Sequence, residues 1–381
     1  MAHELKNFTI GIEEEFQIVD SQTLHLTSGF DTLFQSAPEE FKEYIKPEFL
    51  QSVLEIITPI CDTIDDVNTE TKKIRSAMLA TAQANKMNLI SAGTHPISRW
   101  GEQQRSAGQR YAELEQRLQD VSRSILIFGL HVHICVQDLW ERLQIMNQAR
   151  TFLPHILTLS ANSPFWMKRI TGLMSYRTSV WGPFPFSGTP PIFQSVEEYN
   201  AFKKIFEYTH SVDDVRKVWW DIRPHTHFPT IEFRIADMPS THEDTMAITA
   251  FWLALVKTLH NRIAEDRPLP IYRSEYINEN KWRAARYGLS PECRFIDFEH
   301  YKEIAATDAV KAALDFVAPA AEQLGAAKYL KRAYQLVNRR AKNGAEIQLD
   351  RFYKTGSFDA VTKLLKDQTC KGIPAYQAIM C

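Results

Sequence analysis

Residues 8–19 read FTIGIEEEFQIV and alternate apolar with polar side chains, which is typical of a β-strand with one buried face. In such a strand Glu13 and Glu15 share one face, while Glu14 lies on the other. Two carboxylates about 7 Å apart repel by roughly 2 kcal/mol, so a half-buried face accepts both more readily with a cation between them. An exposed acidic strand end is the alternative for this pair. For Glu14 we expect an ion pair or a local bulge.

Three other strand patterns carry ionisable side chains. The motif GLHVHIC places His131 and His133 together opposite an apolar face, an arrangement that suits metal ligation as well as a satisfied core histidine. The motif TIEFRIAD places Glu232 and Arg234 on one face, where they could also form a plain ion pair. Glu55 stands in the apolar run VLEII and needs a partner, because an unpaired buried carboxylate costs several kcal/mol.

The pattern along the chain predicts an α+β fold in which helices separate the strands. Strands are expected at residues 8–19, 51–58, 87–92, 128–136 and 230–236, and helices at 65–86, 196–208 and 246–263, with a break at Pro154. From residue 301 onward the pattern is helical. We therefore expect one catalytic unit over residues 1–300 and a helical C-terminal segment over residues 301–381 that packs on the same domain.

Taken together, these residues indicate a site for divalent cations and phosphate. Carboxylates with one or two imidazoles favour Mg²⁺ or Mn²⁺, whereas zinc sites prefer more His or Cys. Arg177, Arg223 and Arg234 could bind phosphate, with a surface ion pair as the alternative for each. Cations with guanidinium groups are what phosphoryl transfer from ATP requires. A second pair, His225 and His227, lies between two prolines and is expected to pack in a loop.

Composition excludes several classes of function. The chain has 44 Lys and Arg against 46 Asp and Glu, which argues against broad binding of nucleic acid. Its apolar stretches are far shorter than the roughly 20 residues that span a bilayer, and acidic residues interrupt any N-terminal leader. The five cysteines are scattered, which predicts reduced thiols in a cytoplasmic protein. With only 14 glycines, the chain lacks both common glycine-rich nucleotide motifs, so any phosphates must be held in another way.

Seven segments of the chain form an ordered set: GIEEEF, GTHP, GLHVH, NSPFW, WWDIRP, TIEFRIAD and NKWRAARYGL. In this order they resemble carboxylate-amine ligases of the YbdK type, the second class of glutamate–cysteine ligases, from residue 8 to about residue 289. The resemblance implies a glutamine-synthetase-like fold, in which a curved antiparallel sheet with helices on its outer face holds ATP and divalent cations. It also implies a homodimer, and it leaves open the roles of Gly93–Pro96 and Asn280–Leu289.

The resemblance also implies roles for individual residues. By similarity to glutamine synthetases, one metal ion near the ATP phosphates would be held by Glu13, His131 and Glu232. A second metal ion would be held by Glu15 and Glu55. The residues implied to contact ATP are Glu13, His133 and Arg234. The residues implied to stabilise transferred charge, or to bind the substrate carboxylate, are Arg177, Arg223 and Arg234.

The implied reaction has two steps. ATP phosphorylates a carboxylate, by resemblance the γ-carboxylate of glutamate, to give an acyl phosphate. An amine, for which the family's named substrate is cysteine, then forms the amide γ-glutamylcysteine as ADP and phosphate leave. One departure concerns Ile134, Cys135 and Val136, where a small residue, often Gly, is expected in the family. This departure leaves the floor of the pocket, and with it the specificity for the amine, open.

Two other classes of function are alternatives. A metal-dependent amide hydrolase would use His131 and His133 with carboxylates around zinc. Hydrolases of the amidohydrolase barrel type usually carry the H-x-H pair on their first strand, whereas here it follows more than a hundred residues of other elements. A non-catalytic protein of the same fold could also bind a nucleotide or an amino acid. The set of motifs as a whole favours the ligase.

Overall fold

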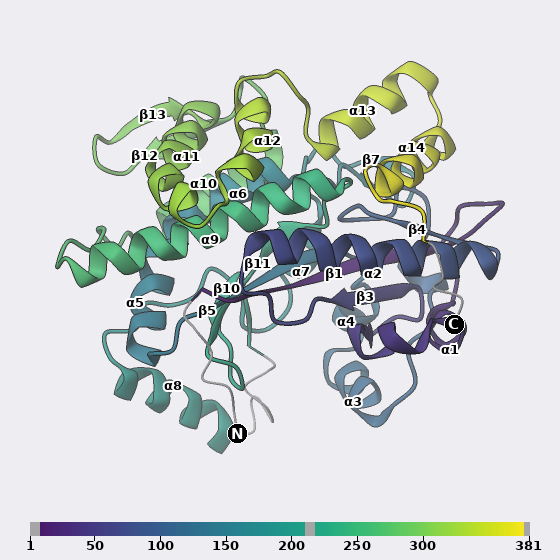
Figure 1. The fold of residues 1–381 in the computed structure, drawn as a ribbon, viewed down its shortest axis with the longest axis horizontal. Coiled ribbons are helices and arrows are strands. Elements are labelled where there is room, and N and C mark those ends of the chain that lie inside the picture. The colour runs from purple at the N-terminus through teal and green to yellow at the C-terminus, as the bar shows by residue number, and fades with distance from the viewer. Residues whose placement is uncertain (1–7, 210–217, 377–381) are drawn as a thin grey trace.

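The computed structural model describes residues 8–209 and 218–376 and has the α+β architecture expected from the sequence (Figure 1). A seven-stranded sheet of antiparallel pairs lies at its centre, in the order β10-β11-β5-β1-β3-β2, with β4 also paired to β1. Its strands are β1 (Ile10–Asp20), β2 (Ile45–Pro47), β3 (Val53–Ile57), β4 (Met87–Ile90), β5 (Gly129–Cys135), β10 (Ile222–Pro224) and β11 (Thr230–Asp237). The five strands predicted from alternation are therefore confirmed.

Helices cover one face of this sheet (Figure 1). The covering helices are α2 (Ile64–Ala84), α5 (Leu139–Ala149), α6 (Leu153–Ser160) and α9 (His242–Ala264). Helix α2 contacts β1 and β4, and α5 contacts β10. Helix α6 contacts β11, and α9 contacts β5. Apolar residues of the strands are buried beneath them, for example Ile12 and Phe233, which are each 1% exposed. The predicted break at Pro154 is confirmed, because a 3₁₀ turn (Arg150–Phe152) separates α5 from α6 and Pro154 lies in the first turn of α6.

Glu14 is held on this covered face by an ion pair with Arg75 of α2. The Arg75 Nε donates to Glu14 Oε2 at 2.7 Å, and the Thr245 hydroxyl of α9 donates to Glu14 Oε1 at 3.0 Å. Both charged side chains are fully buried. Of the two expectations for Glu14, the ion pair is confirmed, and the pair joins β1 to two covering helices. Removing either partner alone would leave an uncompensated buried charge.

The C-terminal part of the described chain is mainly helical. Its helices are α10 (Ser274–Tyr287), α11 (Ala306–Gln323), α12 (Ala327–Val337), α13 (Gly344–Thr355) and α14 (Phe358–Cys370). Helices α11 and α12 pack on α9, whereas α14 packs on α13 and β4. A hairpin of β12 (Arg294–Asp297) and β13 (Lys302–Ala305) lies across residue 300. The division into a unit of residues 1–300 and a packed segment of residues 301–381 stays a prediction.

The connections between these elements contain shorter pieces. The short helices and turns are α1 (Phe30–Ser36), η1 (Glu39–Tyr44), η2 (Trp100–Glu102), α3 (Gln109–Leu118), α4 (Asp120–Arg123), α7 (Arg177–Trp181) and α8 (Val196–Tyr208). The short strands are β6 (Phe165–Trp166) with β7 (Arg169–Ile170), and β8 (Ser187–Gly188) with β9 (Trp219–Trp220). Several of these pieces surround the polar face of the sheet.

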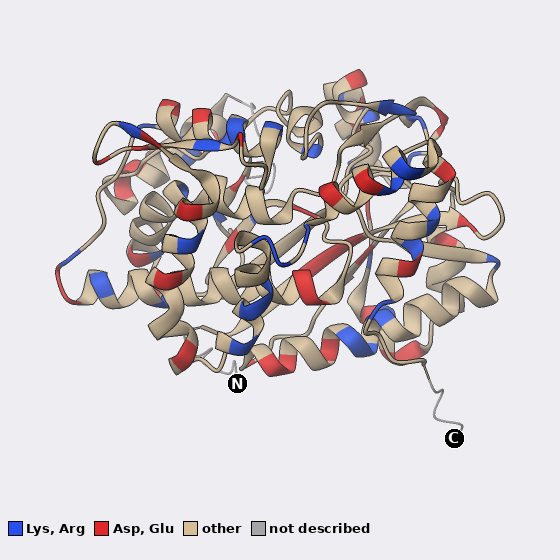
Figure 2. Ribbon diagram, turned by 90° about the horizontal axis from the view of Figure 1, so that it is seen from above, with Lys and Arg blue, Asp and Glu red and all other residues tan. Residues whose placement is uncertain are grey.

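Acidic and basic residues are interspersed along the ribbon, in keeping with a formal net charge of −2 (Figure 2). Among the described residues, no helix is long and apolar enough to cross a membrane. Cys61, Cys135, Cys293 and Cys370 are free thiols, as predicted, and Cys381 lies outside the described residues.

Candidate functional site

The uncovered face of the sheet brings the predicted acidic and imidazole side chains together. Glu13 of β1 lies directly opposite His131 of β5, and Glu15 lies opposite Glu55 of β3. Because side chains alternate along each strand, these four residues share one face. Three segments, two of which are more than a hundred residues apart in the sequence, thus meet at the middle of the sheet.

The next strand, β11, adds an acid and a guanidinium group to the same face. Glu232 lies opposite His133 of β5. Beyond it the register shifts, so that Arg234 and Ile235 together lie opposite the single residue His131. This is a β-bulge, which redirects the side chain of the bulged strand. Arg234 consequently faces the site with its Nη1 3.4 Å from the His131 Nδ1.

Two groups of possible metal ligands result, and they share one imidazole. Ligand atoms of Glu13, His131 and Glu232 all lie within 4.8 Å of one another, and so do those of Glu15, Glu55 and His131. The His131 Nδ1 is 2.8 Å from Glu13, whereas the buried His131 Nε2 has no hydrogen-bond partner among the described residues. Carboxylates with one imidazole and an unsatisfied ring nitrogen fit Mg²⁺ or Mn²⁺ better than zinc.

The carboxylates differ in charge state. Burial raises the pKa of Glu15 to about 7, with help from Glu48, and burial together with Glu13 and Glu48 holds the pKa of Glu55 well above its ordinary value. Burial opposes ionisation of Glu13 too, but the neighbouring histidines, led by His133, outweigh it and lower the pKa of Glu13. Close carboxylates cannot all ionise without added positive charge. The cluster is therefore suited to receive a cation.

Glu232 is ionised between two arginines. The Arg223 Nε and Nη2 donate to its two oxygens at 2.7 and 3.1 Å, and the Arg234 Nη1 donates to Oε1. Burial alone would raise the pKa of Glu232, but Arg223 and Arg234 hold it well below its ordinary value. The ion pair considered from the sequence for Glu232 and Arg234 is thus present. Both arginines nevertheless line the cavity described below.

Arg177 enters the site from α7 and is only 4% exposed. Its Nη1 donates to the main-chain oxygens of Arg234 and Ile235 at 3.2 and 3.3 Å. The guanidinium lies directly over Gly129, where an added Cβ would come within 2.9 Å of the Arg177 Cζ. Burial lowers the pKa of Arg177, while the nearby Glu15 opposes that effect. Any larger residue at position 129 would displace this guanidinium from its place over the strand.

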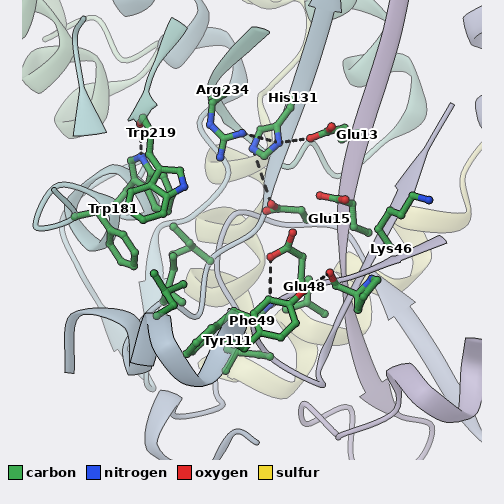
Figure 3. A pocket seen from close by; sticks show the side chains of 18 of the residues that line it. Glu13, Glu15, Lys46, Glu48, Phe49, Tyr111, His131, Trp181, Trp219 and Arg234 are labelled. Carbon is green, nitrogen blue, oxygen red and sulfur yellow. Dashed lines mark hydrogen bonds and ion pairs between the residues drawn. The ribbon is translucent and has the colours of Figure 1, made fainter. Parts of the chain in front are cut away.

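A cavity of about 410 Å³ lies over these groups. Figure 3 shows Glu15, His131 and Arg234 directed toward its middle, with Trp181 and Trp219 together on one wall. Further lining residues that the sequence predictions missed are Lys46, Glu48, Phe49, Arg110, Tyr111 and Phe184. Nearly all of the missed residues lie in loops or short helices. No alternation marks such residues in the sequence, and a lone Glu48 after Pro47 looks like any surface acid.

Some predicted residues lie outside the lining of this cavity. Glu232 and His133 are not among the lining residues, although both contact groups that are. The departure from the family pattern at positions 134–136 is also elsewhere: these three residues are buried in the sheet and do not line the cavity. The lining of this cavity is therefore formed by other residues.

The second histidine pair packs in a turn, as predicted. The His225 Nδ1 accepts hydrogen bonds from the main-chain nitrogens of His227 and Phe228 at 3.2 and 3.1 Å. His225 also stacks on the ring of Phe228 and lines the edge of the cavity. Within the described chain, neither histidine belongs to a group of possible metal ligands.

The two segments whose roles were open are structural. The His95 Nδ1 accepts from the main-chain nitrogens of Ile97 and Ser98, and its Nε2 lies 3.0 Å from the Leu24 oxygen. In α10, Lys281 forms an ion pair with Asp221, which precedes β10. Neither His95 nor Lys281 lines the cavity. Both segments support the elements that surround the site.

Comparison with known proteins gives consistent results. The model of the family described as Glutamate-cysteine ligase family 2 (GCS2) matches residues 9–363. A protein of Solibacter usitatus named "Putative glutamate--cysteine ligase 2" is 40% identical over 375 residues, covering 98% of this chain and 96% of its own. A protein of the same name from Roseiflexus sp. is 38% identical over 371 residues, covering 97% of each chain.

Two solved structures share the fold. The crystal structure of glutamate–cysteine ligase from Francisella tularensis in complex with AMP matches with a TM-score of 0.68 at 14% identity, covering 97% of this chain and 91% of that one. A bifunctional glutathione synthetase from Pasteurella multocida matches with a TM-score of 0.67 at 15% identity, covering 95% of this chain and 52% of that one. At these identities the likeness concerns the fold alone.

Proposed function

The chain belongs to glutamate–cysteine ligase family 2, and from this membership we propose that it joins the γ-carboxylate of glutamate to the amino group of cysteine at the expense of ATP. The single observation that supports the site is the convergence of Glu13, Glu15, Glu55, His131 and Glu232 on one face of the sheet beside a cavity. A carboxylate-amine ligase must hold a polyphosphate next to a carboxylate, and both are anions. The site supplies cation ligands and guanidinium groups in the same place.

We propose that Mg²⁺ or Mn²⁺ is held by Glu13, His131 and Glu232, and a second ion by Glu15 and Glu55. When bound there, such ions supply the positive charge that neutralises the phosphate oxygens of ATP. The unsatisfied His131 Nε2 and the raised pKa of the Glu55 carboxyl, caused first by burial, support this assignment. His131 lies between the two ligand groups.

We assign different roles to the three arginines of the site. Arg177 and Arg234 line the cavity with their guanidinium groups and would bind the transferred phosphoryl group or the substrate carboxylate. Arg223 donates two hydrogen bonds to Glu232, so its role would be to keep that carboxylate ionised and correctly placed. His133, 3.2 Å from Glu13, would orient that ligand on the nucleotide side.

In the second step an amine must lose a proton before or as it attacks the acyl phosphate. Glu48 lines the cavity, and burial raises its pKa. A carboxylate whose pKa lies nearer to neutrality is a better general base than an ordinary one. We propose that Glu48 takes the proton of the attacking ammonium group, which leaves the substrate as a neutral amine.

The two other classes of function find less support. A zinc hydrolase would need more imidazole or thiolate ligands than the carboxylate-rich groups provide. A protein that only binds its ligands has no need of buried, mutually repelling carboxylates next to three arginines. Family membership over residues 9–363 also favours the ligase.

The test is a coupled assay of ADP release with ATP, MgCl₂, glutamate and a panel of amines that includes cysteine. We expect ADP release to require both amino acids, and γ-glutamylcysteine to be the product by mass spectrometry. Amide cleavage without ATP, together with no amine-dependent ADP release, would favour the hydrolase. Binding of Mg²⁺–ATP with no turnover for any amine would favour the binding protein.

The family resemblance further leads us to propose a homodimer in the cytoplasm. Light scattering on the purified chain should give a particle of twice the chain mass of 43.9 kDa. A particle of the single chain mass at micromolar concentration would contradict the dimer.

A further inference from the structure

The start of α13 is docked onto Ala161 and Asn162, the two residues that follow α6. The Gln348 side chain is 1% exposed, and its Nε2 donates to both the main-chain oxygen and the Oδ1 of Asn162, at 3.0 and 2.7 Å. The Ala345 nitrogen donates to the Ala161 oxygen at 2.9 Å. A Cβ added at Gly344 would clash with the Asn162 side chain, because it would lie only 3.0 Å from the Asn162 Cβ. Helix α13 is thus held against Asn162 by hydrogen bonds and by close packing.

Asn162 is also bonded to the strand that carries Arg234. Its main-chain nitrogen donates to the Asp237 Oδ2 at 2.8 Å, and its Nδ2 donates to the Met238 oxygen at 2.7 Å. Asp237 is the last residue of β11 and is fully buried. It lies beside Gly93, where a Cβ would come within 2.9 Å of the Asp237 Cβ. A larger residue at position 93 would therefore displace this carboxylate.

Asp237 in turn fixes the loop that leads into α7. The hydroxyl groups of Ser163 and Ser175 donate to its two oxygens at 2.6 and 2.8 Å. The Ser163 hydroxyl oxygen accepts a hydrogen bond from the main-chain nitrogen of Arg177 at 3.0 Å. An unbroken series of buried contacts therefore runs from Gln348 through Asn162 and Asp237 to the residue whose guanidinium lies over Gly129 in the cavity.

We propose that Gln348 is a positioning residue for Arg177, and that α13 sets the place of this guanidinium in the active site through Asn162 and Asp237. This proposal rests on the proposed function, because its test measures the kinetics of the ligation reaction. It gives the helical C-terminal segment a part in the reaction although none of its residues lines the cavity. Loss of the two Gln348 hydrogen bonds would let Asn162 shift, and with it the main-chain nitrogen that donates to Asp237 and the start of α7.

A purely structural role for Gln348 would have a different consequence. A residue that only stabilises the fold lowers the amount of folded enzyme and leaves the kinetic constants of the folded fraction unchanged. A residue that positions Arg177 changes those constants in the folded enzyme, and it does so only while Arg177 is present. The two roles are therefore separated by a double-mutant cycle.

The experiment uses the full chain with Gln348→Met, which keeps the length of the side chain and removes both donors, in the wild-type and Arg177→Lys backgrounds. We expect Gln348→Met alone to lower kcat/KM for the ligation about tenfold, with normal circular dichroism. In the Arg177→Lys background the same change should lower kcat/KM less than twofold. Gln348→Leu, which also removes the donors and adds no charge, should behave like Gln348→Met.

The matched control is Thr369→Val in α14. The buried Thr369 hydroxyl accepts from the Ser91 nitrogen, so this variant also loses one buried contact of the C-terminal segment, but one that does not lead to Arg177. Thr369→Val should lower thermal stability and leave kcat/KM unchanged. An equal fall for Gln348→Met in both backgrounds, or no fall at all, would overturn the proposal. Failure of both Gln348 variants to fold would overturn it as well, because a positioning residue is not needed for folding.

If the wild-type chain turns over none of the tested substrates, the proposed function fails independently of the positioning proposal. The cycle is then read from the binding of Mg²⁺–ATP by calorimetry. Weaker binding in each single variant with no further loss in the double variant supports positioning, and additive losses contradict it.

Discussion

Glu15 and Glu55 lie directly opposite each other on β1 and β3, and both side chains line the cavity. Like charges facing each other across a sheet destabilise it, and burial increases the cost because the charged form is less well solvated. Nothing in packing requires two acids at this position. The arrangement is stabilised only when positive charge is supplied, which is what a site for divalent cations does.

Glu55→Gln should therefore separate stability from activity. Replacing one acid by a neutral group of the same size removes the repulsion, so we expect the free energy of unfolding in EDTA to rise by about 1–2 kcal/mol. The same change removes a metal ligand, so kcat should fall at least about a hundredfold, on the order of what loss of a ligand costs. Chemical denaturation and the ADP assay check the two effects. Glu39→Gln, at an exposed acid of η1, should change neither.

Binding of Mg²⁺ should release protons near neutral pH. Burial, and next Glu48, raises the pKa of Glu15 to about 7, so below that pH the free site holds protons that a cation must displace. The affinity for Mg²⁺ should accordingly rise as the pH rises toward and through 7. Calorimetry at pH 6.5 in buffers of different ionisation enthalpy measures the number of protons. Equal heats in all buffers would show that the carboxylates are already ionised, and Glu55→Gln should release fewer protons than the wild type.

Arg223→Lys tests whether the arginine pair on Glu232 matters for turnover. Arg223 donates two hydrogen bonds to this carboxylate, and a lysine can reproduce the charge but not the fork of two parallel donors. We expect kcat/KM to fall about ten- to a hundredfold while the chain stays folded, because Glu232 loses its fixed orientation. Arg283→Lys is the control, since that arginine forms its ion pairs with Glu279 and Glu303 away from the cavity. Similar kinetic losses in both variants would contradict a specific role.

Strand periodicity was sufficient to predict which side chains share a face, because alternation is a local property of the backbone. It placed Glu13 with Glu15, and His131 with His133, without knowledge of strand pairing. The pairing itself could not be read in the same way, since β1 and β5 are more than a hundred residues apart. His133 therefore pairs with Glu232 and stays outside the cavity lining, a consequence of register that alternation cannot show.

Residues that reach the cavity from loops and short helices were beyond prediction for a different reason. Trp181 and Tyr111 lie in short helices, and Glu48 lies between β2 and β3. Their orientation depends on tertiary contacts such as the hydrogen bond from the Tyr111 hydroxyl to the Pro47 oxygen at 2.7 Å. The bulge at Arg234 could not be predicted from the sequence either, because it arises only from the pairing of β11 with β5.

His95 should make the stability of the protein depend on pH in the acidic range. Burial lowers the pKa of His95 to about 3, and its Nδ1 accepts two main-chain hydrogen bonds that a protonated ring cannot accept. In the unfolded chain the ring titrates near its ordinary pKa of 6.5. Between these two values the unfolded chain binds a proton that the folded chain does not, so stability is full above about pH 6.5 and falls as the pH falls toward 3.

The measurement is the free energy of unfolding by urea at pH 7, 6, 5 and 4. For one such histidine the expected loss is about 1.4 kcal/mol per pH unit below its unfolded pKa. His95→Gln should be less stable than the wild type at pH 7, since it cannot keep all three hydrogen bonds. Its free energy of unfolding should nevertheless fall less steeply as the pH is lowered, by a slope that corresponds to the uptake of about one proton fewer on unfolding. His227→Gln, in an exposed turn, should retain the wild-type slope. An unchanged slope in His95→Gln would show that this ring is already protonated in the folded protein at pH 4, and that its main-chain contacts do not hold it neutral.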